Sequence, residues 1–195
     1  MKNTVVIIPG LGDEVHALEY ITRHFNKYGL DVAVHSIGWR DGTADFHPKF
    51  NKLLRHIDEL SETSKVSIIG TSAGGSAALN AFTKRKKVVY KVVNLSGILR
   101  SSKEVGWRSF EERTKSSPQF AQSVKMFTNL ENSLSAVDRK RVMTVYPKFG
   151  DELVAPDTVT LSGAMNIRIP SIEHVLSIAL ALTIFSKPVI SFLNT

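Results

Sequence analysis

The sequence has no cysteine among its 195 residues. This absence excludes disulfide bonds, thiolate nucleophiles and zinc sites built on cysteine. A chain without cysteine also suits a reducing compartment, so we expect a cytoplasmic protein.

Long hydrophobic runs are absent as well. The most apolar segment, residues 175–185, has about half of the roughly 20 residues that cross a bilayer, and Lys187 and Pro188 follow it. The first residues run directly into a short apolar stretch, without the longer core and small-residue cleavage site of a secretory signal. We therefore expect a buried helix near the C-terminus, no membrane span and no secretory signal.

Acidic residues are the minority among the charged ones. The chain carries 25 Lys and Arg against 18 Asp and Glu, a net charge of +7. No helix-turn-helix, RNP, KH or zinc-finger signature accompanies this charge, so we expect no nucleic-acid partner. The densest basic run, residues 84–87, falls where a helix should end, and cations suit that end of the helix dipole. A patch for an acidic partner is the alternative interpretation of this run.

The apolar residues, 43% of the chain, follow two alternating periods. Six short runs rich in β-branched residues predict buried strands: residues 4–9, 31–37, 65–69, 88–95, 141–146 and 164–169. Spacings of three and four predict helices over residues 14–28, 46–60, 73–82 and 174–185. This alternation predicts an α/β fold of three layers, in which about six mostly parallel strands have helices on both faces.

Residues 98–140 break the alternation, because this segment is too long for one crossover helix. Ser117 followed by Pro118 is a favourable helix start, and apolar residues follow at helical spacing. We expect a single domain over residues 1–195, in which residues 98–140 form a cap-like insertion of one to three short helices.

The pattern G-x-S-x-G occurs at Gly70, Ser72 and Gly74, where a strand should turn into a helix. A nucleophile at the tip of such a turn has a strained backbone, and glycine on either side removes side chains that would clash. The turn also points Ser72 toward the positive end of the following helix. A glycine-rich turn that happens to contain a serine is the alternative.

Together with three other features, this turn resembles the α/β-hydrolase family, and the four features follow one another in the family's order. They are the loop at residues 8–12 after the first strand, the turn at Ser72, an acid at Asp151 after the penultimate strand, and His174 after the last strand. The resemblance covers nearly the whole sequence. It implies a catalytic triad of Ser72, Asp151 and His174, with the backbone N–H groups of Leu11 and Ala73 as the oxyanion hole.

Other residues compete for two of these roles. Glu152 and Asp157 are alternative acids, and His174 could instead be a core or helix-capping histidine. The chain also departs from the family, because Pro9 precedes Gly10 where His-Gly is frequent, and Thr71 stands where His is frequent. Two antiparallel strands of the full family fold have no room before Thr4, which suits a minimal six-stranded member.

Several cofactor motifs are missing. A dinucleotide loop at Gly10 and Gly12 would need glycine at Val15, no P-loop pattern occurs, and no histidine–carboxylate spacing matches a catalytic metal site. We therefore expect neither cofactor nor metal.

The resemblance implies that the insertion roofs the active site. Four aromatic residues could line an acyl pocket there or simply pack the insertion onto the body: Trp107, Phe110, Phe120 and Phe127. Three basic residues near the roof, Arg100, Lys103 and Arg108, suggest an anionic substrate. We expect a serine hydrolase that cleaves a small-molecule carboxylic ester or thioester. The alternative is a weakly catalytic or non-catalytic protein-interaction module on the same scaffold, and the sequence does not predict the oligomeric state.

Overall fold

The computed structural model describes residues 2–43, 45–101, 109–151 and 153–195. Six strands form one sheet in the order β2-β1-β3-β4-β5-β6, and all neighbouring strands are parallel. Their bounds are β1 Lys2–Ile8, β2 Leu30–Val34, β3 Ser64–Thr71, β4 Val89–Leu95, β5 Val142–Pro147 and β6 Met165–Ile169. The six predicted strands are confirmed, although β2 ends at Val34 rather than at residue 37.

The strand order reverses at β1. The chain leaves β1 toward β2 on one side and later places β3 on the other side, with Ile8 level with Gly70. At such a reversal the loops that follow the two strands diverge, and a crevice opens at the carboxyl ends of the strands. The loops after β1 and β3 carry Leu11 and Ser72, so the topology brings these two predicted site residues to one crevice.

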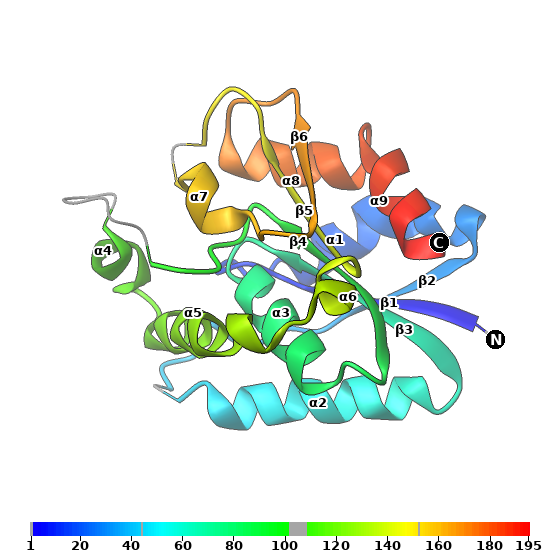
Figure 1. Cartoon of the computed structure of the whole chain (residues 1–195), viewed down its shortest axis with the longest axis horizontal. Helices are drawn as coiled ribbons and strands as arrows, with labels where there is room; N and C mark the ends of the chain where they lie inside the picture. Colours follow the sequence, from blue (N-terminus) through cyan, green and yellow to red (C-terminus); the bar gives the residue numbers. More distant parts are fainter. Residues whose placement is uncertain (1, 44, 102–108, 152) are drawn as a thin grey trace.

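Successive residues of β1 face opposite layers of helices. Val6 and Ile8 belong to a core shared with the helices α2 (His47–Ser61), α3 (Gly74–Lys84) and α5 (Pro118–Leu130). Val5 and Ile7 belong to a core shared with the helices α1 (Val15–Thr22), α8 (His174–Leu182) and α9 (Ser186–Asn194). Figure 1 shows these two groups of helices on opposite sides of the sheet. Both faces of the strands are therefore buried, as their continuous apolar pattern predicts.

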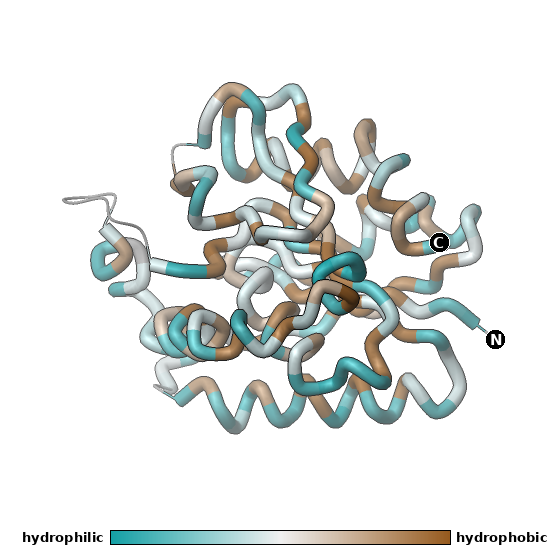
Figure 2. Tube along the Cα trace, in the orientation of Figure 1, coloured by the Kyte–Doolittle hydropathy of each residue, from teal (hydrophilic) through white to brown (hydrophobic). Residues whose placement is uncertain are grey.

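The predicted helices are present with small changes of boundary. Their bounds are α1 Val15–Thr22, α2 His47–Ser61, α3 Gly74–Lys84 and α8 His174–Leu182, and a 3-10 helix, Arg23–Tyr28, continues α1. Two helices were not predicted, α7 Pro156–Val159 and α9 Ser186–Asn194. In Figure 2 apolar and polar residues alternate along α2, as expected for a helix with one buried face.

The predicted insertion contains α4 Phe110–Thr114, α5 Pro118–Leu130, a 3-10 turn Glu131–Ser133 and α6 Ala136–Arg139. Ser117 caps α5, because its Oγ accepts a hydrogen bond from the N–H of Phe120. Buried polar contacts fasten α5 to α3: the Oγ atoms of Ser76 and Ser123 lie 2.8 Å apart, and Asn80 Nδ2 donates to the carbonyl of Ser123 at 2.8 Å. The division into one domain with a cap-like insertion stays a prediction.

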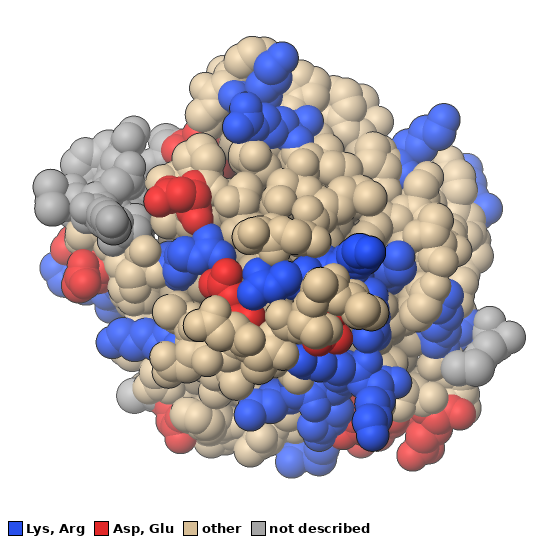
Figure 3. Space-filling model, viewed as in Figure 1, with Lys and Arg blue, Asp and Glu red and all other residues tan. Residues whose placement is uncertain are grey.

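The basic run at residues 84–87 begins at the last residue of α3 and leads toward β4, as expected. Figure 3 shows Lys and Arg side chains gathered below the middle of this face of the molecule. Two members of the run are paired, Arg85 with Asp58 at 2.8 Å and Lys86 with Asp138 at 2.9 Å. Part of this positive surface is therefore neutralised within the fold.

In the described part of the chain, no single helix has the length and apolar character needed to cross a membrane. The bent pair α8 and α9, with an angle of 55° between them, meets that requirement only when taken together.

Candidate active site

Ser72 lies in the sharp turn from β3 into α3, with φ at +50°. The turn is crowded on both sides. A Cβ on Gly70 would lie 2.3 Å from the carbonyl oxygen of Gly74, and a Cβ on Gly74 would lie 2.1 Å from the carbonyl oxygen of Ile8. Both distances are too short for real atoms, so only glycine fits at these two positions. The strained serine between two glycines is the geometry that the pentapeptide predicts.

The end of the neighbouring strand β4 supports this turn through residues that the sequence did not single out. Asn94 Nδ2 donates to the carbonyls of Gly97 and Val159 at 2.9 and 3.2 Å, and Asn94 Oδ1 accepts from the N–H of Gly97. Gly75 is also constrained, since its Cβ would lie 2.0 Å from Asn94 Oδ1. No local motif identifies Asn94, because Val159 and Gly75, which it meets across the fold, are distant in sequence.

His174 joins Ser72 to Asp151. His174 Nε2 lies 2.9 Å from Ser72 Oγ, and Nδ1 lies 2.8 Å from Asp151 Oδ2. Because a carboxylate only accepts hydrogen bonds, Nδ1 carries the proton and Nε2 is left to accept from the serine hydroxyl. The side chains of His174 and Asp151 are each only 5% exposed. The three residues thus form one hydrogen-bonded chain, in which the histidine and the acid are shielded from water.

The surrounding backbone holds Asp151 in place. Its Oδ1 accepts hydrogen bonds from the N–H groups of Leu153 and Val154 at 2.8 and 3.0 Å. The alternative acid Asp157 lies in the first turn of α7, and Glu152 lies outside the described residues. Asp151 is therefore the described carboxylate that the structure brings to His174.

The other histidines lie away from Ser72 in contacts of their own. His16 contacts Glu19, His24 contacts Ser186, His47 contacts Asp45, and His35 faces His56 with their Nδ1 atoms 2.8 Å apart. Burial and the neighbouring His56 lower the pKa of His35 to about 4. His174 begins α8, whose cap is the preceding Glu173.

The two expected oxyanion donors flank Ser72 from different loops. Leu11 follows β1, and Ala73 immediately precedes α3. Within the described residues, no hydrogen bond occupies either of these backbone N–H groups. Both donors are thus available to an oxygen beside Ser72, which is what an oxyanion hole requires. Their role stays a prediction.

A cleft of about 260 Å³ opens over Ser72 and His174. Its other described lining residues are Leu11, Arg40, Ser96, Ile98, Ser116, Phe120, Leu153 and Val154. Of the aromatic residues proposed for an acyl pocket, Phe120 lines the cleft, whereas Phe110 and Phe127 are buried in the core. Trp107 lies outside the described residues.

Of the basic residues expected near the roof, the described one, Arg100, does not line the cleft. Arg100 is paired with Glu131 at 2.9 Å and donates to the carbonyl of Thr160, and Lys103 and Arg108 lie outside the described residues. The cleft contains a different cation, Arg40, which the sequence analysis missed. In the described ranges, no group of three or more potential ligands from His, Asp and Glu side chains could hold a metal ion.

Comparisons with known proteins concern the family and the fold of the chain. A family model described as "Putative esterase" matches residues 1–161, whereas a search of curated proteins finds no match. Among solved structures, a carboxylesterase from the thaumarchaeon Nitrososphaera gargenis has a TM-score of 0.72 at 14% identity, covering 99% of this chain and 90% of its own.

Two further structures have the same fold. One comes from the metagenome-derived lipolytic enzymes LipS and LipT, with a TM-score of 0.66, 11% identity and coverage of 99% and 94% of the two chains. The other is a monoacylglycerol lipase from Paleococcus ferrophilus, with a TM-score of 0.63, 14% identity and coverage of 97% and 93%. At these identities the likeness concerns the fold: a six-stranded parallel sheet covered on both faces.

Proposed function

We propose that the chain is a serine hydrolase. It belongs to the esterase family whose model it matches, and it has the α/β-hydrolase fold. In this proposal it cleaves a small carboxylic ester or thioester through Ser72, His174 and Asp151, by way of an acyl-enzyme. Hydrolysis of esters is the activity that the family model supports.

Acylation begins when Ser72 Oγ attacks the carbonyl carbon of the ester while His174 Nε2 takes the hydroxyl proton. The carbonyl oxygen becomes negative and accepts hydrogen bonds from the N–H groups of Leu11 and Ala73. As the tetrahedral intermediate collapses, the bond to the leaving alcohol or thiol breaks, and His174 gives its proton to that group. Asp151 holds the imidazole in the required tautomer and stabilises its positive form.

Deacylation repeats these steps with water. His174 Nε2 removes a proton from a water molecule that attacks the acyl carbon, and a second oxyanion forms beside Leu11 and Ala73. The bond between the acyl group and Ser72 Oγ then breaks, and the proton returns to the serine. The products are a carboxylic acid and the free enzyme.

The observation that carries the proposal is the buried hydrogen-bonded chain from Asp151 through His174 to the strained Ser72. This arrangement is costly to maintain, because it keeps a serine at positive φ and buries a carboxylate. It favours hydrolysis over the alternative of a protein-interaction module, for which these contacts have no use.

A panel of para-nitrophenyl esters of graded acyl length tests the proposal. We expect wild-type protein to hydrolyse short esters best, because the cleft is small, and we expect Ser72→Ala and His174→Ala to lower kcat/KM by about a thousandfold or more. His16→Ala, which removes an exposed histidine that does not line the cleft, is the matched control and should keep wild-type activity. Equal activity in wild type and folded Ser72→Ala would refute the mechanism.

A further inference from the structure

Arg40 is the one Lys or Arg among the described residues that line the catalytic cleft, and no Asp or Glu lies among them. The remaining lining residues are apolar side chains, three serines and His174. The described lining of the cleft thus joins an apolar surface, a set of hydroxyl groups and one positively charged side chain. A cleft of this composition favours a ligand that carries a negative charge.

Two carboxylates near Arg40 are already engaged elsewhere: Asp41, the next residue in sequence, and Asp13, which contacts the preceding Trp39. The adjacent Asp41 accepts hydrogen bonds from Lys49 at 2.6 Å and from Thr43, and the bond from Lys49 lowers the pKa of Asp41 to about 2. Asp13 accepts from Ser36 and from the backbone N–H of Trp39, both at 2.9 Å. Within the described ranges the Arg40 guanidinium has no hydrogen-bond or ion-pair partner of its own.

The backbone that leads into Arg40 is held firmly. Trp39 is buried, its indole N–H donates to the carbonyl of Pro9 at 3.0 Å, and its own carbonyl accepts from Ser117 Oγ at 2.7 Å. These bonds tie Arg40 to the loop that carries Leu11 and to the start of α5. The position of Arg40 relative to the cleft is therefore set by the fold, while its guanidinium stays available.

From these observations we propose that Arg40 is a specificity-determining residue, which binds a second, anionic group of the ester substrate. The inference rests on the proposed function and specifies its substrate class: a small ester or thioester that also carries a carboxylate or phosphate. A guanidinium presents paired N–H donors that match the two oxygens of such a group. Binding this group orients the ester, so that its carbonyl lies at Ser72 and its apolar part lies against Leu11, Phe120 and Leu153.

Two pairs of substrates test the proposal and distinguish the source of the anion. In one pair, mono-para-nitrophenyl glutarate is compared with the para-nitrophenyl ester of valeric acid, which lacks the terminal carboxylate. In the other, acetoxyethyl phosphate is compared with the acetate of methoxyethanol. The selectivity of each pair is the ratio of kcat/KM for the anionic ester to kcat/KM for the neutral ester. It is measured in wild type and in three variants: Arg40→Gln, Arg40→Lys and Arg55→Gln.

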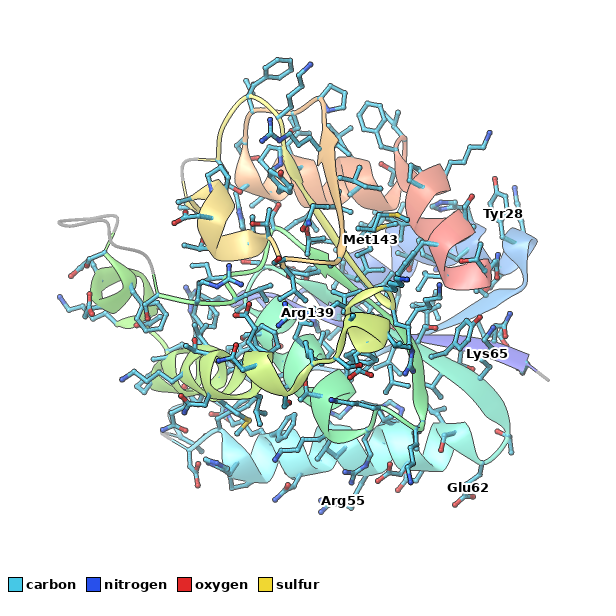
Figure 4. The ribbon with its side chains drawn as sticks, viewed as in Figure 1. Tyr28, Arg55, Glu62, Lys65, Arg139 and Met143 are labelled. Atoms are coloured by element: carbon cyan, nitrogen blue, oxygen red, sulfur yellow. The ribbon has the colours of Figure 1, made fainter. Side chains whose placement is uncertain are left out.

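Arg55 lies exposed on α2 and projects away from the body of the protein in Figure 4, so Arg55→Gln removes the same charge from outside the cleft. We expect Arg40→Gln to lower the selectivity roughly tenfold or more in at least one pair, chiefly through KM, because a charge-assisted hydrogen bond is lost. Arg40→Lys should keep part of the selectivity and Arg55→Gln all of it. Selectivity that is the same in wild type and Arg40→Gln for both pairs would overturn the proposal, while hydrolysis of the neutral esters would leave the proposed function intact.

Binding provides a readout that does not depend on turnover. Calorimetry with glutarate, inorganic phosphate and the neutral valeramide is carried out on Ser72→Ala and on the double variant Ser72→Ala, Arg40→Gln. We expect glutarate or phosphate to bind Ser72→Ala more tightly than valeramide does, and we expect the affinity for that anion to fall roughly tenfold in the double variant. Identical binding by the two variants would contradict the role of Arg40 even if no ester were cleaved.

Discussion

At the scale of single residues, Ser72 combines two demands that conflict. Its hydroxyl must stand clear of the sheet, and this requires a backbone with φ at +50°, which side chains with a Cβ disfavour. The surrounding contacts hold this conformation: the N–H of Ser72 donates to the carbonyl of Leu95, and its carbonyl accepts from Gly75, both at 2.9 Å. The serine is thus held in a conformation that it would not adopt alone.

This strain predicts that glycine at position 72 gives a more stable protein than alanine does, although neither variant has activity. Ser72→Gly should have a free energy of unfolding about 1 kcal/mol higher than that of Ser72→Ala, because glycine accepts positive φ without a Cβ clash. Both variants should be inactive. Urea unfolding at neutral pH measures the difference, with Ser76→Gly against Ser76→Ala on α3 as the matched pair, for which the order should reverse. If Ser72→Ala proved as stable as Ser72→Gly, the turn would not be strained.

The sequence predicts part of this site. Ser72 carries a local signature, and Asp151 and His174 follow strands in the order that the resemblance implies. Arg40 and Asn94 have no such signal, because each acts through neighbours that only the fold supplies. The basic residues that the sequence favoured for an anionic substrate include Arg100, whose partner Glu131 lies 31 positions away. A pattern along the chain does not show that such a charge is already paired.

At the scale of elements, β2 and α2 meet through a pair of histidines. The Nδ1 atoms of His35 and His56 lie 2.8 Å apart, so one ring must donate and the other accept. Protonation of both rings would remove this hydrogen bond and place two positive charges together. Burial and His56 accordingly lower the pKa of His35 from 6.5 to about 4.

This lowered pKa predicts a loss of stability in mild acid. Between pH 6.5 and pH 4 the unfolded chain binds a proton at His35 that the folded chain does not, so the free energy of unfolding falls as the pH falls through this window. Below about pH 4 His35 is protonated in both the folded and the unfolded chain, so this residue no longer makes the free energy of unfolding change with pH.

Urea unfolding at pH 7 and pH 5 measures the effect. Wild type should lose about 1 kcal/mol more than His35→Gln between these two values, after allowance for solvent screening at a partly exposed site. His16→Gln removes an exposed histidine and should lose as much as wild type. An equal loss in wild type and His35→Gln would show that the pair does not control acid stability.

The elements themselves could be predicted in part. Buried parallel strands leave a continuous apolar run in the sequence, and all six runs were found. The sequence pattern does not predict α9, because Pro188 is unfavourable inside a helix. In the structure Pro188 lies in the first turn of α9, where the backbone N–H has no partner to lose. The helical pattern at residues 14–28 contains a change from α-helix to 3-10 helix, and spacing alone does not reveal this change.

At the scale of the whole molecule, the strand reversal at β1 brings the parts of the site together. The loop after β1 carries Leu11, the loop after β2 carries Arg40 and the loop after β3 carries Ser72. Asp151 lies in the loop after β5, and His174 begins α8. Because all six strands are parallel, the loops that follow them open at one edge of the sheet. A small chain can therefore place the proposed nucleophile, its base and the proposed substrate-binding cation around one cleft.

The measurement that tests this account most directly is covalent labelling by a fluorophosphonate, followed by mass spectrometry of the labelled peptides. The account predicts one modified residue, Ser72, with no labelling in folded Ser72→Ala or His174→Ala and full labelling in the Arg55→Gln control. A folded, ester-hydrolysing wild-type protein that is labelled at another residue, or not at all, would contradict the assignment of Ser72 as the nucleophile.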